Sequence, residues 1–222
     1  MTENVAREQI NLKVKENLEV VAENLQYPKN LVFDSNGVMY FIDANEIKFM
    51  NNDGIIETLV KNEIFSDYRP NFCNKSFPLK SFKFYWPLSL AVNPIDNSLY
   101  VIDEGVIYKI AFEVVSIIAG QPFRCNNNTI FKLNNPIDMA FSNEGDLYVL
   151  ENDSLSGIKQ ISLINTDGSI EIFYGEKNQL KTSYSQGAVF SDENSIKFNN
   201  PIAIVVHQNR SVYVLDKGNI IF

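Results

Sequence analysis

The residues whose type and spacing could do chemistry are four acids that recur along the chain. They are Asp43, Asp103, Glu151 and Asp216, and each follows a tyrosine by three residues. Carboxylates that converged on one point could bind calcium, which takes oxygen ligands. One acid in every copy of a pattern instead indicates a structural role, because a carboxylate just after a strand can accept backbone N–H bonds of the next turn. We expect that structural role here, and no metal site.

Catalytic groups of other kinds are scarce. The only histidine is His207, and the two cysteines, Cys73 and Cys125, lie far apart in the sequence. Two cysteines make no zinc site without further ligands, and the sequence has neither a Ser/Cys–His–Asp set of nearby residues nor a Gly-rich phosphate loop. We therefore expect no enzymatic activity, no catalytic or cofactor-binding residues and no cofactor.

The four acids belong to one sequence unit that occurs four times. The unit begins with a proline and continues through an alternating strand, a turn and a second strand that ends at the acid. The step from proline to tyrosine is 12, 13, 12 and 12 residues, and the step from tyrosine to the acid is 3 every time. The repeat cores span residues 27–43, 86–103, 135–151 and 200–216.

The position within the repeat predicts the surroundings of two single residues. His207 follows the repeat proline Pro201 by six residues, where the other copies have turn residues. We therefore expect His207 in a turn and not as a ligand or base. Trp86 precedes a repeat proline, as Tyr27 does, and we expect it to pack against its neighbours rather than stack on a ligand.

Each core is followed by more strand-like sequence. The Asp-Gly pairs at 53–54 and 167–168 lie between alternating β-branched runs. They predict hairpins, because glycine supplies the positive φ that a tight turn needs. Four short strands in a unit of roughly 40 to 50 residues are typical of a β-propeller blade. The sequence therefore predicts an all-β propeller over residues 24–222.

The ends of the chain predict partial blades. The fourth copy stops at Phe222, inside its third strand. Residues 1–23 resemble the end of a preceding blade or an N-terminal extension, because apolar residues alternate there, although an amphipathic helix is the competing interpretation. We expect three full blades and two partial ones, cut from a ring of six; a four-bladed ring closed by pairing of the ends is the alternative.

Composition and charge exclude other classes of partner. The formal net charge is -8, which gives the chain no electrostatic attraction to phosphate backbones, so we expect no nucleic acid. No apolar run reaches the length of a membrane span, and the N-terminus has no apolar signal core. We expect no small-molecule substrate, and contact with a membrane only through a longer parent protein.

Residues 67–73, 85–103 and 117–125 carry the most specific pattern in the chain. From Trp86 to Asp103 the sequence follows W-P-x-x-L-A-x-N-P-x-D-N-S-x-Y-V-x-D. This pattern resembles the NHL-type propeller of the teneurin family, and the resemblance extends over roughly residues 24–222. Teneurins are single-pass type II membrane proteins, with EGF-like domains, whose extracellular regions mediate cell–cell adhesion and signalling. The resemblance implies an extracellular, non-catalytic recognition propeller that contacts protein partners at cell–cell contacts.

The resemblance also bears on four residues in predicted loops. Cys73 and Cys125 lie in the best-matching segments, in the loops that leave successive blades, so it favours a disulfide between them over two free thiols. Asn74 and Asn127 begin Asn-x-Ser/Thr sequons and are the better candidates for glycosylation. Sequons also begin at Asn152 and Asn209. The family's longer insertion after Cys125 and its later cysteine-rich loop are shortened or absent here.

Two other functions stay open. A calcium-dependent hydrolase or lyase of the six-bladed propeller type would need asymmetric acids and amides converging on the axis, whereas the acids recur symmetrically. A cytosolic NHL scaffold or RNA-binding domain would need a basic face, and no cluster of lysine or arginine stands out.

Overall fold

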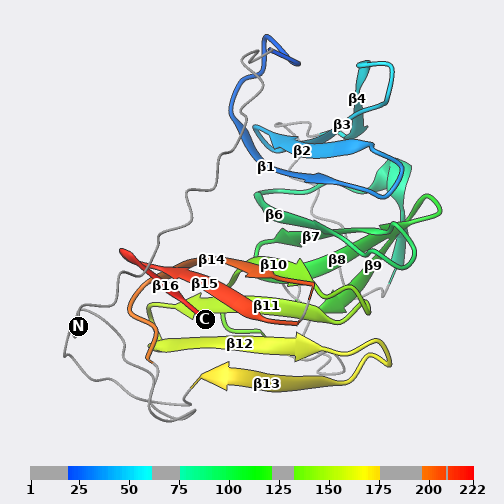
Figure 1. Ribbon diagram of the computed structural model, residues 1–222. Coiled ribbons are helices and arrows are strands. Elements are labelled where there is room, and N and C mark those ends of the chain that lie inside the picture. The colour runs from blue at the N-terminus through cyan, green and yellow to red at the C-terminus, as the bar shows by residue number, and fades with distance from the viewer. Residues whose placement is uncertain (1–19, 62–75, 122–132, 176–196, 209) are drawn as a thin grey trace, which may run out of the picture.

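The computed structural model describes residues 20–61, 76–121, 133–175, 197–208 and 210–222. These residues form four antiparallel sheets arranged as the blades of a propeller, one sheet for each repeat (Figure 1). They contain strands and one short 3-10 helix, and no α-helix. The predicted all-β propeller is confirmed, whereas the origin of these blades in a ring of six stays a prediction.

Blades 1 and 3 are meanders of four strands in chain order. Blade 1 consists of β1 (Pro28–Phe33), β2 (Met39–Asp43), β3 (Glu46–Met50) and β4 (Ile56–Val60). Blade 3 consists of β10 (Pro136–Phe141), β11 (Leu147–Asp153), β12 (Ile158–Ile164) and β13 (Ile170–Gly175). The predicted Asp-Gly turns join the third strand to the fourth in both blades.

Blade 2 has a fifth strand and blade 4 has three. Blade 2 consists of β6 (Pro87–Val92), β7 (Leu99–Asp103), β8 (Val106–Ala111) and β9 (Val114–Ala119), and β5 (Ser76–Pro78) pairs with the outer edge of β9. The helix η1 (Leu79–Ser81) follows β5. Blade 4 consists of β14 (Pro201–Val206), β15 (Val212–Asp216) and β16 (Asn219–Ile221). The partial blade predicted before residue 24 lies mostly outside the described residues.

In every blade the proline begins the first strand and pairs with the acid of the second. The pairs are Pro28 with Asp43, Pro87 with Asp103, Pro136 with Glu151 and Pro201 with Asp216, and a β-bulge follows each proline. Proline has no N–H to donate to the ladder, so it is confined to positions such as the first residue of a strand, where that donor is not needed. The first strands β1, β6, β10 and β14 contact one another in that order, which sets the order of the blades.

Hydrophobic clusters fill the three spaces between successive blades. Val101 of β7 packs toward blade 1, and its neighbour Ile102 packs toward blade 3. Val149 and Leu150 of β11 divide in the same way between blades 2 and 4. Successive residues of a strand face opposite sides, so a strand buried on both faces is apolar throughout. This explains why apolar and polar residues do not alternate along the repeated Tyr-Val-x-acid strand.

An aromatic cluster reinforces the contact between blades 1 and 2. The segment of β5 and η1 brings Phe82 and Phe84 onto Tyr108 of β8, with ring centroids 5.1 and 5.5 Å apart, and the two phenylalanine rings lie 4.9 Å from each other. Tilted and edge-to-face arrangements at these distances are favourable. All three rings are buried in the core between the blades.

Candidate functional site

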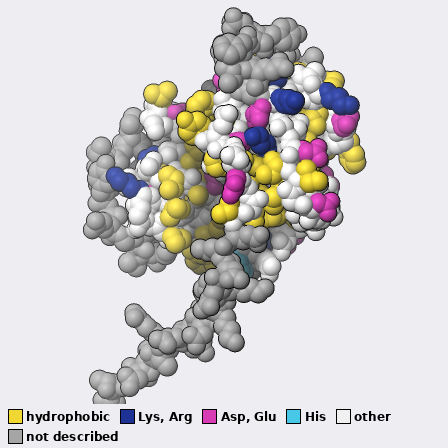
Figure 2. Space-filling model, turned by 90° about the horizontal axis from the view of Figure 1, so that it is seen from above, with side chains coloured by type: hydrophobic (Ala, Val, Ile, Leu, Met, Phe, Trp, Pro, Cys, Tyr) yellow, Lys and Arg dark blue, Asp and Glu magenta, His cyan; other side chains and the backbone are white. Residues whose placement is uncertain are grey.

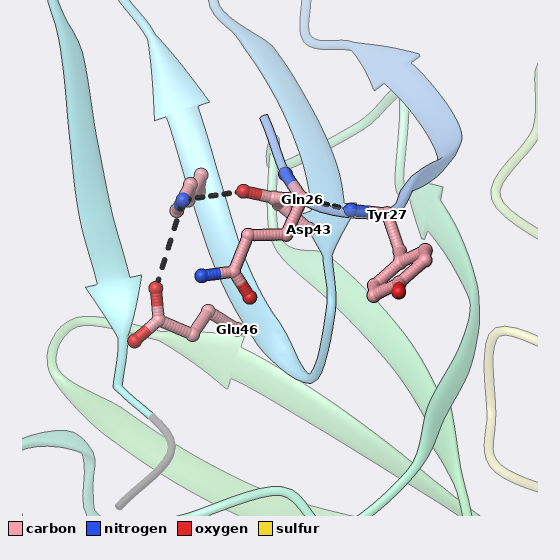
Figure 3. Close-up of polar contacts among 5 residues, drawn as sticks. Gln26, Tyr27, Asp43 and Glu46 are labelled. Carbon is pink, nitrogen blue, oxygen red and sulfur yellow. Dashed lines mark hydrogen bonds and ion pairs between the residues drawn. The ribbon is translucent and has the colours of Figure 1, made fainter. Parts of the chain in front are cut away.

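The four recurring acids are buried and accept hydrogen bonds from the backbone. None of them is more than 3% exposed. Asp43 accepts the N–H groups of Gln26 and Tyr27 on Oδ1, at 2.8 and 2.9 Å (Figure 3). The side chain of Tyr27 extends away from this carboxylate, so only its backbone takes part.

The other three acids repeat this arrangement. The N–H donors are Tyr85 and Trp86 for Asp103, Asn134 for Glu151, and Asn199 and Asn200 for Asp216. Each donor lies one or two residues before a repeat proline. The acids therefore accept backbone N–H bonds, as expected, but the predicted location of the donors was wrong. They belong to the segment that leads into the blade and not to the next turn.

Side chains from the third strand complete the surroundings of two of these acids. Lys48 donates to Asp43 at 2.6 Å and lies 3.7 Å from Glu46 (Figure 3). Burial opposes ionisation of Asp43, but the bond from Lys48 and the two N–H groups outweigh it and hold its pKa below the ordinary value. Glu151 accepts bonds from Gln160, at 3.0 Å, and from Ser162. Such carboxylates have little capacity left for a ligand. Among the described residues, no three His, Cys, Asp or Glu side chains are grouped to hold a metal ion.

A second set of polar residues links neighbouring blades and was missed from the sequence. These residues lie two positions after the repeat prolines, at the bulge. Asn30 accepts the N–H of Leu90 in blade 2, at 2.9 Å. Asp138 accepts the N–H of Ile204 in blade 4, at 2.8 Å, and the hydroxyl of Ser89 in blade 2, at 2.7 Å. Burial raises the pKa of Asp138, and its hydrogen bonds oppose that rise. The sequence does show that Asn30 and Asp138 occupy the same position of the repeat. The hydrogen-bond partners of Asp138 lie 49 and 66 residues away, however, so no local pattern indicates them.

The residues just before the prolines form an asymmetric surface, which we call the proline end of the blades. Tyr27 is 77% exposed and Trp86 is 63% exposed, so the expectation that Trp86 is packed was wrong. The ammonium of Lys29 in blade 1 lies 5.4 Å from the centroid of the Trp86 ring, a cation–π distance. Blades 3 and 4 have Asn135 and Asn200 at the same positions.

The asparagines of blades 3 and 4 are engaged in a polar network with Asn152. Asn135 donates to the carbonyl of Asn152 at 2.6 Å, and the side-chain amide of Asn152 donates to Asn200 and to the carbonyl of Pro201. The amide nitrogen that a glycan would require at the Asn152 sequon is therefore occupied. A hollow of about 400 Å³ opens beside Asn135, lined further by Leu133, Asn134, Asp153, Ser154 and Leu155.

The remaining predicted sites divide between described and undescribed parts of the chain. His207 lies in a turn, as predicted, with its carbonyl accepting the N–H of Arg210 at 2.8 Å. Cys73, Cys125, Asn74 and Asn127 lie outside the described residues. On the face shown in Figure 2, basic side chains are scattered among acidic and hydrophobic ones and form no continuous patch. No helix in the described part of the chain has the length and apolar content to span a membrane.

Comparisons with known proteins agree with this architecture. The family model for the Teneurin NHL domain matches residues 13–222. Teneurin-m of Drosophila melanogaster is 32% identical over 210 residues, and Teneurin-3 of Mus musculus is 30% identical over 218 residues. These matches cover 88% and 90% of this chain, which spans only 8% of either relative. A solved structure described as a gluconolactonase from Xanthomonas campestris matches with a TM-score of 0.58 at 13% identity, over 91% of this chain and 60% of that one. At that identity the likeness concerns the fold alone.

Proposed function

Because the chain belongs to the teneurin NHL domain family, we propose that it is a protein-recognition propeller in the extracellular region of a membrane-anchored adhesion and signalling receptor. In this proposal the chain has no catalytic activity and acts by contact with protein partners where cells meet. The chain spans about 8% of the length of the relatives that it matches. The membrane anchor and the adhesive role are therefore proposed as properties of a longer parent protein.

The observation that carries the proposal is the exposure of Tyr27 and Trp86 at the proline end of blades 1 and 2, with the half-buried Lys29 beside the Trp86 ring. Tryptophan and tyrosine are enriched among the residues that dominate protein–protein binding energy, because they combine a large apolar area with a polar tip. Both rings are more than half exposed and contribute little to the core. Their repeat equivalents Asn135 and Asn200 lie in a polar network instead. Function is expected where a repeat loses its symmetry, because symmetric positions serve the scaffold.

Comparison of equivalent positions in the four blades also argues against catalytic activity. The acids that all four blades share are buried, and their oxygens accept hydrogen bonds from backbone N–H groups. A general acid or base has to reach a substrate proton directly or through one water. Carboxylates held in this way are poorly suited to that task.

A binding experiment on intact cells tests the proposal. The purified 222-residue chain is coupled to fluorescent beads and applied to adherent cells, with and without prior digestion of the cell surface by trypsin. We expect binding that trypsin removes, and at least about tenfold weaker binding for Trp86→Ala. Leu155→Ala is the matched control, because Leu155 is fully exposed at the same end of blade 3. Equal binding by the Trp86 variant and the control would remove the main support for the proposal.

A further inference from the structure

The turn between β8 and β9 has residues that do not suit its backbone. Phe112 and Glu113 form its centre, with φ angles of 49° and 60°. A two-residue hairpin turn with positive φ at both positions strongly favours asparagine and glycine, because a larger side chain crowds the backbone there. Phe112 is also 99% exposed, so its ring gains no packing against the described residues in return.

The corresponding turns of blades 1 and 3 show that these turn residues are peculiar to blade 2 among these three blades. In blade 1 the turn from Asn51 to Ile55 includes Gly54 at φ 77°, and in blade 3 the turn from Asn165 to Ser169 includes Gly168 at φ 82°. Glycine takes the positive φ in both, and their remaining central residues are polar. A strained turn with an aromatic tip is therefore no requirement of the fold.

The Phe112 turn is held in one conformation by the additional segment of blade 2. The N–H of Leu79 donates to the carbonyl of Glu113 at 2.7 Å, and Lys80 lies 3.7 Å from the Glu113 carboxylate. Next to the turn, Pro78 of β5 pairs with Val114 of β9, and both side chains are exposed. The backbone that carries the ring is thus braced and has apolar neighbours, so fixing the position of this backbone costs little entropy on binding.

We propose that Phe112 inserts into an apolar pocket on a protein partner. This inference rests on the proposed recognition function and adds a second contact to it. Trp86 precedes β6 and Phe112 follows β8, two parallel strands, so the two contacts lie at opposite ends of blade 2. Beside the ring, the charges of Glu113 and Lys80 oppose each other at 3.7 Å, so we expect the pocket to be recognised by its apolar surface and not by its charge. The net charge of -8 disfavours an anionic membrane, and one ring is too little apolar surface for a lipid anchor.

Variants of the turn can separate recognition from folding. Phe112→Asn removes the ring and supplies a residue that tolerates positive φ, so the chain should melt at the same or a higher temperature. In the bead assay on intact cells, we expect this variant to bind at least about tenfold more weakly than the unaltered chain. The double variant Phe112→Asn/Glu113→Gly should melt higher still and bind no better. Leu155→Asn, at an equally exposed apolar turn residue without positive φ, should bind normally.

The possible results distinguish this inference from the proposed function. If Phe112→Asn binds like the unaltered chain while Trp86→Ala binds weakly, the Phe112 contact is refuted and the proposed function stands. If the unaltered chain binds no cells, both are refuted. Binding that survives trypsin, or that is matched by protein-free vesicles of phosphatidylcholine and phosphatidylserine, would refute a protein partner for the ring.

Discussion

Asp138 accepts hydrogen bonds from blades 2 and 4 and so joins three blades, and its replacement measures how much these bonds stabilise the fold. Asp138→Ala leaves the N–H of Ile204 and the hydroxyl of Ser89 without their acceptor. Ile204 is 3% exposed and Ser89 is 1% exposed, so water has little access to either residue. An unsatisfied buried polar group costs about 1–3 kcal/mol. Because burial of the carboxylate is itself unfavourable, removing it offsets part of this loss, and we expect a net destabilisation of about 2–3 kcal/mol.

Asp138→Asn is the matched variant, because an amide can keep both hydrogen bonds. Its oxygen can accept the N–H of Ile204, and its nitrogen can donate to the oxygen of Ser89. Asn30, at the same repeat position in blade 1, accepts the N–H of Leu90 in this way. We expect this variant to lie within about 1 kcal/mol of the unaltered chain.

The two chains should also differ in their response to pH. Burial raises the pKa of Asp138 in the folded state. The stability that Asp138 contributes is therefore complete below the pKa of the unfolded chain, about 4, and is lost as pH rises through the folded-state pKa. Asparagine does not titrate, so Asp138→Asn should gain stability relative to the unaltered chain as the pH is raised from acid to neutral.

Urea denaturation followed by far-ultraviolet circular dichroism, at several pH values, measures these differences. An Asn variant as unstable as the Ala variant would show that the two hydrogen bonds are not what the carboxylate contributes. A difference between the Asn variant and the unaltered chain that is independent of pH would contradict the raised pKa of Asp138.

Three further predictions concern other parts of the chain. Glu113→Gly should stabilise the fold by about 1 kcal/mol, seen as a higher melting temperature, because glycine relieves the positive φ; no increase would mean that the turn is not strained. Adding calcium or a chelator should leave the melting temperature unchanged, and a calcium-dependent rise would favour the hydrolase alternative. Mass spectrometry of the non-reduced protein from its native source should find a bond between Cys73 and Cys125, whereas two free thiols would favour a cytosolic scaffold.

The repeated elements of the fold were predictable because each copy has the same task. The Pro-to-acid unit predicted the first two strands of every blade, and Pro28 and Asp43 pair as the two ends of such a unit. The Asp-Gly turns predicted the outer hairpins of blades 1 and 3. In these places the local sequence preference and the final structure agree, and four copies confirm one another.

The elements that occur once were not predictable. Strand β5 has three residues and no periodicity of its own, and it exists because β9 offers it an edge. The link from Asp138 to Ile204 spans 66 residues, so no local pattern could reveal it. The exposure of Trp86 depends on which surface the neighbouring blade covers, and the local preferences of the residues do not determine that. Phe112 and Glu113 carry no turn signal, since their conformation is imposed by the strands on either side.

The contrast between positions repeated in every blade and positions that occur once indicates where partners bind. Acids that tie the same backbone in every blade can change little without loss of stability, so they cannot easily be adapted to a partner. The positions that are free to differ are exposed, and blade 2 has both Trp86 and Phe112 among them. Blade 2 also has the fifth strand, and the buried aromatic cluster around Phe82 packs it against blade 1. Because a rigid scaffold lowers the entropy cost of association, blade 2 is where substitutions of exposed residues should change binding most while changing stability least.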